Sequence, residues 1–269
     1  MPLLLALALT GLTVPARADP STDLETLARK YGIKVELCRK DFSIRYLGSR
    51  SGHIAGKPPD EAEVKAYTPI FLKEFDIYPV DLIRKSKLQR IVLCSGLNYS
   101  GQLRAAVPDL YRDVLYLDVA RGNWSKLYVR KVLHHEFFHI IDWRDDGKLY
   151  QDKKWARLNP NGFRYRAGGA AAQTDPKESL TTGKLPGFLS KYSTAGVEED
   201  KAEVFAHMMV DYPTVWKRAQ EDPVVKKKVR RMKSLLNRFS RSMNAKFWKQ
   251  RARSGAEDRS RTGTPRKGS

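Results

Sequence analysis

The segment KLYVRKVLHHEFFHIID, residues 126–142, decides the fold because it combines a helical pattern with a metal-binding spacing. Within it, residues 135–139 read HEFFH, a match to the pattern HExxH. Two histidines four residues apart lie on one face of a helix, so both imidazoles can reach one zinc ion. The glutamate between them lies beside water at the metal and can take its proton. The segment therefore predicts a long zinc-binding helix that begins near residues 123–125 and ends near Asp142.

A zinc hydrolase needs a third protein ligand and an open fourth position. A histidine six residues after His139 would extend the motif, but that position is Asp145. The later segment EEDKAEVFAH, residues 198–207, is also predicted to be helical. Three of its side chains are spaced by four residues and share one helical face, and the spacing alone leaves each open as the third ligand: Glu199, Glu203 and His207.

Together these residues resemble the gluzincins, the zinc peptidases that combine HExxH with a glutamate, and within them the catalytic domain of anthrax lethal factor and the secreted pro-pro endopeptidases. The resemblance covers roughly residues 110–212. Beyond HExxH, it rests on a tyrosine seven residues before the ligand glutamate and an acid four residues after it, here Tyr192, Glu199 and Glu203. It implies a zincin-like fold, zinc as the cofactor, and a peptide or protein as the substrate.

The resemblance also implies a role for each matching residue. It assigns zinc binding to His135, His139 and Glu199, and it makes Glu136 the general base that takes a proton from zinc-activated water. The fourth ligand position would remain open for water or substrate.

The remaining matches would support those ligands. Tyr192 would donate a hydrogen bond to the developing oxyanion, and Glu203 would orient a ligand histidine. Glu203 remains the alternative third ligand, whereas His207 lies two turns beyond the matching position. Asp142, three residues after His139, either supports a ligand or is an ordinary acid at the helix end.

Hydrophobic patterning predicts an α+β fold, with a small mixed sheet beside the HExxH helix and a mainly helical C-terminal part. Pro108 marks an edge strand or a bend within the β-rich run 105–119. The expected strands cover residues 33–37, 88–94 and 114–119. The other expected helices cover residues 21–31, 58–78 with Pro69 as a kink, 197–210, and a last helix with apolar positions from Val225 to Phe247.

This pattern predicts a single peptidase domain over residues 19–250, with an N-terminal part to residue 145 and a helical part from residue 146. Residues 147–191 show no sustained periodicity, and so long a connection usually has a function. Residues 251–269 are polar, basic and rich in glycine and serine, which predicts a disordered tail.

The first 18 residues resemble a secretory signal peptide, with a short apolar stretch followed by Ala16-Arg17-Ala18. Cleavage after Ala18 would make the protein secreted or periplasmic. In that setting the two cysteines, Cys38 and Cys94, could form a disulfide or remain as buried thiols.

The formal net charge of +20 is concentrated near the C-terminus. Residues 215–269 contain 18 Lys and Arg against 4 Asp and Glu, whereas residues 1–214 contain 32 against 26. The last helix therefore has an apolar face, which favours packing on the core, and a basic face that is either solvated or in contact with an anionic surface. We expect a monomer without a specific nucleic-acid partner.

Composition limits the classes of protein that fit. A chain of 269 residues with 41% hydrophobic residues can bury a core, which excludes a protein that is disordered over its whole length. Mean hydropathy of -0.53, without an apolar run of about 20 residues, excludes a polytopic membrane protein. The motifs favour a secreted zinc endopeptidase. The alternatives are an exported protein that binds anionic polymers or membrane through its basic C-terminal helix, with a structural or inactive zinc site, and a zinc hydrolase of other bonds, such as peptidoglycan cross-links.

Overall fold

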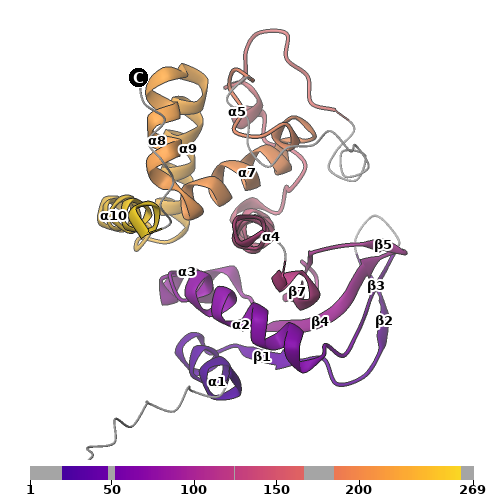
Figure 1. The fold of residues 1–269 in the computed structure, drawn as a ribbon. Coiled ribbons are helices and arrows are strands. Elements are labelled where there is room, and N and C mark those ends of the chain that lie inside the picture. The colour runs from indigo at the N-terminus through magenta and orange to yellow at the C-terminus, as the bar shows by residue number, and fades with distance from the viewer. Residues whose placement is uncertain (1–19, 48–51, 124, 167–184, 262–269) are drawn as a thin grey trace, which may run out of the picture.

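A computed structural model describes residues 20–47, 52–123, 125–166 and 185–261 (Figure 1). The first half of the chain contains both helices and strands, and the second half is helical. Helix α4 (Lys126–Asp146) lies between the two halves, so one of its sides faces the sheet and the other faces the C-terminal helices.

The sheet is small, mixed and bent. Strands β1 (Lys34–Leu37) and β7 (Val114–Asp118) pair in parallel with the first half of β4 (Arg90–Tyr99), and β6 (Ala106–Asp109) pairs antiparallel with β7 as an edge strand. The hairpin of β2 (Phe42–Arg45) and β3 (His53–Lys57) pairs with the second half of β4, beside the short β5 (Gln102–Leu103). Where β4 changes partners, Gly96 has a φ of 60°, a left-handed conformation that favours glycine and permits the bend.

Each face of the sheet is covered by a different part of the chain. Ile91 and Leu93 of β4 face the main core, which includes side chains of α1 (Pro20–Tyr31), α2 (Glu61–Phe75), α3 (Val80–Ser86) and α4. Val92 and Cys94 face the opposite side, where they pack with side chains of the β2–β3 hairpin in a second cluster. The strict alternation of strand side chains therefore builds two cores from one strand.

The C-terminal half is built from α7 (Val197–Val210), α8 (Tyr212–Glu221), α9 (Pro223–Phe239) and α10 (Ala245–Arg261). Helix α7 packs along α4, and this contact brings residues some 60 positions apart in the sequence together. Asp222 caps α9 by accepting hydrogen bonds from the backbone N–H groups of Val224 and Val225. The buried stripe of α9 then follows the helical repeat at Val225, Val229, Met232 and Leu236.

The α+β fold, with a small mixed sheet beside the HExxH helix, is confirmed. The predicted helix over residues 197–210 is present with those bounds, and Pro108 lies in edge strand β6 as expected. The β2–β3 hairpin and β5 were not predicted, because strands of two to five residues are too short for an apolar pattern to identify them, although Phe42 and Ile44 of β2 do alternate with polar residues.

Two predictions for the C-terminal region are wrong. The helix expected across Val225–Phe247 is two helices, α9 and α10, which are separated at residues 240–244. The disordered tail expected from Arg251 is instead helical to Arg261, because the buried Arg251 guanidinium donates to the Met209 carbonyl at 2.6 Å and fixes α10 against α7.

Other predictions are not tested by the fold. The signal peptide and the cleavage after Ala18 lie outside the described residues, as do residues 167–184 of the long connection and residues 262–269 of the tail. The division into parts at residues 145 and 250 stays a prediction. Within the described ranges, none of the helices has the length and apolar character needed to cross a bilayer.

Candidate metal centre

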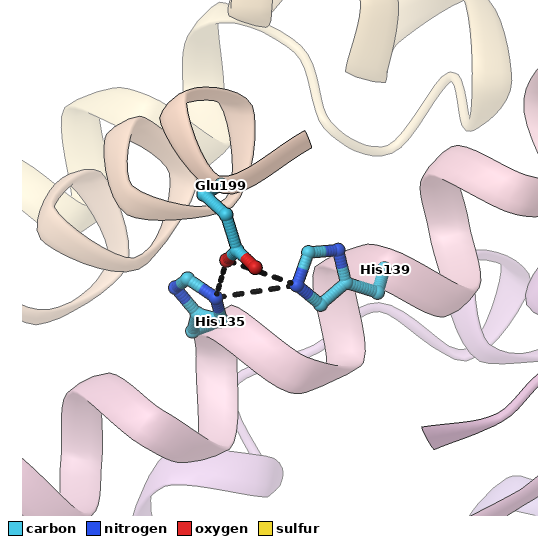
Figure 2. A group of neighbouring side chains, drawn as sticks. All are labelled: His135, His139 and Glu199. Carbon is cyan, nitrogen blue, oxygen red and sulfur yellow. Dashed lines mark hydrogen bonds and ion pairs between the residues drawn. The ribbon is translucent and has the colours of Figure 1, made fainter. Parts of the chain in front are cut away.

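Three buried side chains from two helices point toward one another (Figure 2). His135 and His139 come from α4, and Glu199 comes from the first turn of α7. The Nε2 atom of His135 lies 2.9 Å from Oε2 of Glu199 and 3.2 Å from Nε2 of His139. The same Glu199 oxygen lies 3.6 Å from Nε2 of His139. One potential ligand atom from each residue therefore lies within 3.6 Å of the other two.

These distances suit a zinc ion. A tetrahedral site with bonds of 2.0–2.2 Å has ligand atoms about 3.3 Å apart, close to the three distances in this group. Nδ1 of His135 lies 3.0 Å from Oε1 of Glu203, and a carboxylate only accepts, so Nδ1 carries the proton. Nε2 then faces the Glu199 oxygen at 2.9 Å, a separation at which either a proton or a metal cation lies between the two atoms.

The electrostatics of the group also favour a cation. Burial lowers the pKa of His135, but the hydrogen-bonded carboxylates of Glu199 and Glu203 outweigh it and raise that pKa to about 10. The same histidines hold the pKa of Glu199 well below its usual range despite its burial. An environment that stabilises positive charge at this point attracts a metal ion for the same reason.

Glu203 lies on the other side of the His135 ring from the three converging atoms. Its second oxygen, Oε2, lies 3.2 Å from Nζ of Lys131, one helical turn before His135. Burial raises the pKa of Glu203, but the Lys131 ammonium and His135 hold it well below its usual range. The geometry therefore brings Glu199, and not the alternative Glu203, into the group with both histidines.

Two further residues of the predicted site lie beside the ligand group. Glu136 is half-buried on α4, and its removal from water raises the pKa of its carboxyl although the two histidines oppose that shift. Tyr192 begins the 3-10 helix η2 (Tyr192–Thr194) just before α7, and its ring centroid lies 5.7 Å from that of His135.

The remaining candidates have other contacts. Nδ1 of His207 lies 2.8 Å from the Glu203 carbonyl of its own helix. Asp142 forms a buried ion pair with Lys201 of α7, and its burial raises its pKa to about 6. Asp142 thus contacts a lysine of the helix that carries Glu199.

His134 faces away from the metal-binding group, as its position on the helix predicts. Its Nε2 atom donates to the buried Glu74 of α2 at 3.0 Å, and the Tyr78 hydroxyl donates to its Nδ1 atom at 2.5 Å. Arg130 completes this network through its Nε atom, 2.7 Å from Glu74. Sequence reasoning missed the network because its members lie about 60 residues apart, and it missed Lys131 although the i, i+4 spacing to His135 was visible.

The long connection between the motifs is tied to the ligand helix beside the site. The indole N–H of Trp155 and the hydroxyl of Tyr165 both donate to Oδ2 of Asp200, at 2.8 and 2.7 Å. Lys228 of α9 reaches the same oxygen at 2.7 Å. These aromatic residues therefore anchor the connection next to Glu199.

An HExxH helix crossed by a second helix that supplies a glutamate, beside a small mixed sheet, defines a zincin-like metalloprotein. Residues 81–252 match the family model described as "Putative zinc-binding metallo-peptidase". Because the match spans more than half of the chain, the chain belongs to this zinc-binding metallopeptidase family. Neither the curated proteins nor the solved structures contain a significant match to it.

Proposed function

We propose that this metallopeptidase is an exported endopeptidase of the gluzincin type, in which His135, His139 and Glu199 hold the zinc ion. The observation that carries the proposal is the meeting of these three donors from α4 and α7 at distances that fit tetrahedral zinc. When bound, zinc supplies a Lewis acid that polarises the scissile carbonyl and makes water a better nucleophile.

The chain's own residues would move the protons and hold the developing charge. Glu136 takes a proton from the attacking water on a carboxylate oxygen and passes it to the nitrogen of the leaving amine. Its raised pKa favours both transfers, because it brings the carboxyl closer to neutral pH. The Tyr192 hydroxyl donates a hydrogen bond to the carbonyl oxygen as negative charge grows there.

Edge strand β6 offers a place for an extended substrate near α4. The N–H of Asp118 donates to the Ala105 carbonyl, so alternate residues 105, 107 and 109 bond to β7. The N–H and carbonyl of Ala106 and the carbonyl of Pro108 then point outward. We infer that the backbone of a peptide pairs with these groups by β-strand addition.

Zinc stoichiometry and proteolysis of variants test the site. His135→Ala and Glu199→Ala should each lose zinc, whereas Glu136→Gln should keep it and lose peptide hydrolysis by about 10²-fold or more. His53→Ala is the matched control, because His53 is exposed in β3, away from the ligand helices.

Three results would contradict the proposal. Undiminished zinc content in both ligand variants would show that these residues do not bind the metal. Wild-type turnover by Glu136→Gln would show that Glu136 is not the general base. If the protein hydrolysed isolated peptidoglycan but no protein or peptide pool, its function would be that of a cell-wall hydrolase and not of an endopeptidase. Export is tested separately by sequencing the N-terminus of the mature protein, which should begin at Asp19.

A basic surface on the C-terminal helices favours a second function, the binding of an anionic partner. Residues 213–253 contain 14 Lys and Arg against 2 Asp and Glu, and α8, α9 and α10, which carry most of them, lie together at one side of the molecule (Figure 1). Trp216 of α8 is 48% exposed on this basic region, and an exposed tryptophan suits the interface of a membrane. We propose that this surface binds an anionic lipid bilayer.

Vesicle sedimentation tests this binding. The full chain should sediment with vesicles that contain phosphatidylglycerol, less so at high salt, and not with pure phosphatidylcholine. Reversing Arg230 and Lys249 to glutamate should weaken binding, whereas the same reversals at the exposed Lys40 and Lys65 should not. Equal binding to neutral vesicles, or equal loss in both double variants, would contradict this surface. Proteolysis that survives the reversal would make the surface accessory to the enzyme.

A further inference from the structure

The two cysteines occupy opposite positions on neighbouring strands. Parallel strands β1 and β4 pair in a register that runs from Lys34 opposite Arg90 to Leu37 opposite Leu93. The next step of this register places Cys38 opposite Cys94. The N–H of Cys38 donates to the Leu93 carbonyl at 2.8 Å, so the pairing continues to this position.

Their side chains also lie on one face of the sheet. Directly opposite residues on adjacent strands point the same way, and both cysteines pack in the second hydrophobic cluster beneath the β2–β3 hairpin. Neighbouring strands are about 4.8 Å apart, within the range of about 4.4–6.8 Å that Cα atoms joined by a disulfide show. Cys38 follows the last residue of β1, where the backbone can make a small adjustment.

The structure has both as free thiols. We propose that Cys38 and Cys94 form an intramolecular disulfide that joins β1 to β4 when the protein is in an oxidising compartment. This bond would link β1 covalently to its neighbour in the sheet. Among the described strands, β1 pairs only with β4. It would close a loop containing the β2–β3 hairpin, α2 and α3, and so join parts of both cores.

Unequal access to the two sulfur atoms sets the order of the reaction. Cys94 is fully buried, with its Sγ 3.6 Å from the Leu117 carbonyl, whereas Cys38 is half-buried. The Cys38 thiolate attacks a small disulfide such as oxidised glutathione, forms a mixed disulfide and releases one glutathione thiol. The Cys94 sulfur then loses its proton and attacks Cys38, which releases the second. Two protein thiols are oxidised and one external disulfide is reduced to two thiols.

Burial raises the pKa of both thiols, so little thiolate is present at neutral pH. The oxidation is therefore best followed above about pH 8, where more thiolate forms. The proposal does not depend on the zinc site, so the zinc-ligand variants neither support nor contradict it.

Mass spectrometry of the full-length chain tests the bond. After incubation with oxidised glutathione, the intact mass should fall by about 2 Da, and neither cysteine should react with iodoacetamide after denaturation unless a reductant is added first. Digestion should yield one linked pair of peptides containing Cys38 and Cys94. Cys38→Ser is the control, because it removes the accessible sulfur and should keep Cys94 alkylatable after the same treatment.

Denaturation by urea provides a second measurement. The urea midpoint of the oxidised wild type should be higher than that of the reduced wild type, and oxidised and reduced Cys38→Ser should have the same midpoint. Full alkylation of both cysteines after oxidation would overturn the proposal. A stable glutathione adduct on Cys38, or a dimer linked through Cys38, would also overturn it, because each shows that Cys94 does not reach the mixed disulfide.

Discussion

Replacing Glu203 with glutamine should weaken zinc binding although Glu203 is not in the converging group. Its carboxylate accepts from Nδ1 of His135 at 3.0 Å and pairs with Lys131 at 3.2 Å. Glutamine has nearly the same shape and can still accept the imidazole proton through its amide oxygen. The substitution therefore removes the negative charge that would make His135 a stronger ligand, together with the ion pair to Lys131.

The size of the effect follows from the histidine. Its surroundings raise the pKa of His135 from 6.5 to about 10, which corresponds to about 5 kcal/mol of net stabilisation of positive charge at that ring. Glu203 is one of several carboxylates that raise this pKa, so removing its charge should cost only part of the stabilisation, about 1–3 kcal/mol. That range equals about a 10- to 100-fold loss of zinc affinity, the usual effect of removing a partner of a ligand histidine.

Competition with a fluorescent zinc chelator measures the affinity. Glu74→Gln is the matched control, because Glu74 is an equally buried glutamate bonded to the adjacent His134 on the other side of α4. It should destabilise the fold but leave zinc affinity unchanged. Equal zinc affinity in wild type and Glu203→Gln, or equal losses in Glu203→Gln and Glu74→Gln, would refute the reasoning that charge passes through His135.

The other predictions concern stability. The contacts of Glu74 with His134 and Arg130 outweigh its burial and lower its pKa from 4.5 to about 2, so this carboxylate contributes about 3 kcal/mol above pH 4.5 that is lost as the pH falls toward 2. Urea titrations should therefore show Glu74→Gln less stable at neutral pH, with the difference closing in acid; a constant difference would contradict this. Lys228→Met leaves the Asp200 carboxylate buried without the ammonium 2.7 Å away and should cost about 3–5 kcal/mol by urea denaturation, which an unchanged midpoint would contradict. Gly147→Ala, at the α4 C-cap with φ 70°, should cost about 1 kcal/mol and lower the melting temperature by about 2–4 °C; an unchanged melting temperature would show that the cap tolerates a side chain.

The parts of the fold that apolar spacing encodes were predictable. Strands β1, β4 and β7 and helices α4 and α7 were predicted from the apolar residues within their own segments and from the residues that end those segments. The break between α9 and α10 was not, since the apolar spacing continues from Leu236 through Phe239, Met243 and Phe247. The helix stops where the buried Ser240 donates to Asp81 at 2.5 Å, a contact across 159 positions, and Asn244 caps the next helix.

The candidate site was predictable to the same extent and for the same reason. An i, i+4 spacing places His135 with His139, and Glu199 with Glu203, on shared helical faces, whatever the rest of the fold does. Which glutamate meets both histidines depends on how α7 crosses α4, and that crossing angle is set by tertiary packing. Spacing therefore identified the candidate residues and left both glutamates open. The family resemblance favoured Glu199, and in the structure Glu199 lies with both histidines.

The helix α7 was predicted, but the partners of its charged side chains could not be read from its own pattern. Every residue from Val197 to Val210 is buried, including the consecutive charged residues Glu199, Asp200 and Lys201. Such charges are stable inside a protein only when each has an opposite partner, and here each one has a different partner. Glu199 faces the two histidines, Asp200 binds Lys228, and Lys201 binds Asp142.

The contacts of Asp200 and Lys201 connect the helix that carries Glu199 to the neighbouring parts of the structure. Asp200 holds Trp155 of the long connection and Lys228 of α9, while Lys201 holds the end of α4 beyond His139. We expect that loss of either contact would change the orientation of α7 and so the distance of Glu199 from the histidines. The buried ion pairs thus fix the rotation of the ligand helix, so Lys228→Met should weaken zinc binding as well as stability, although Lys228 lies outside the ligand group.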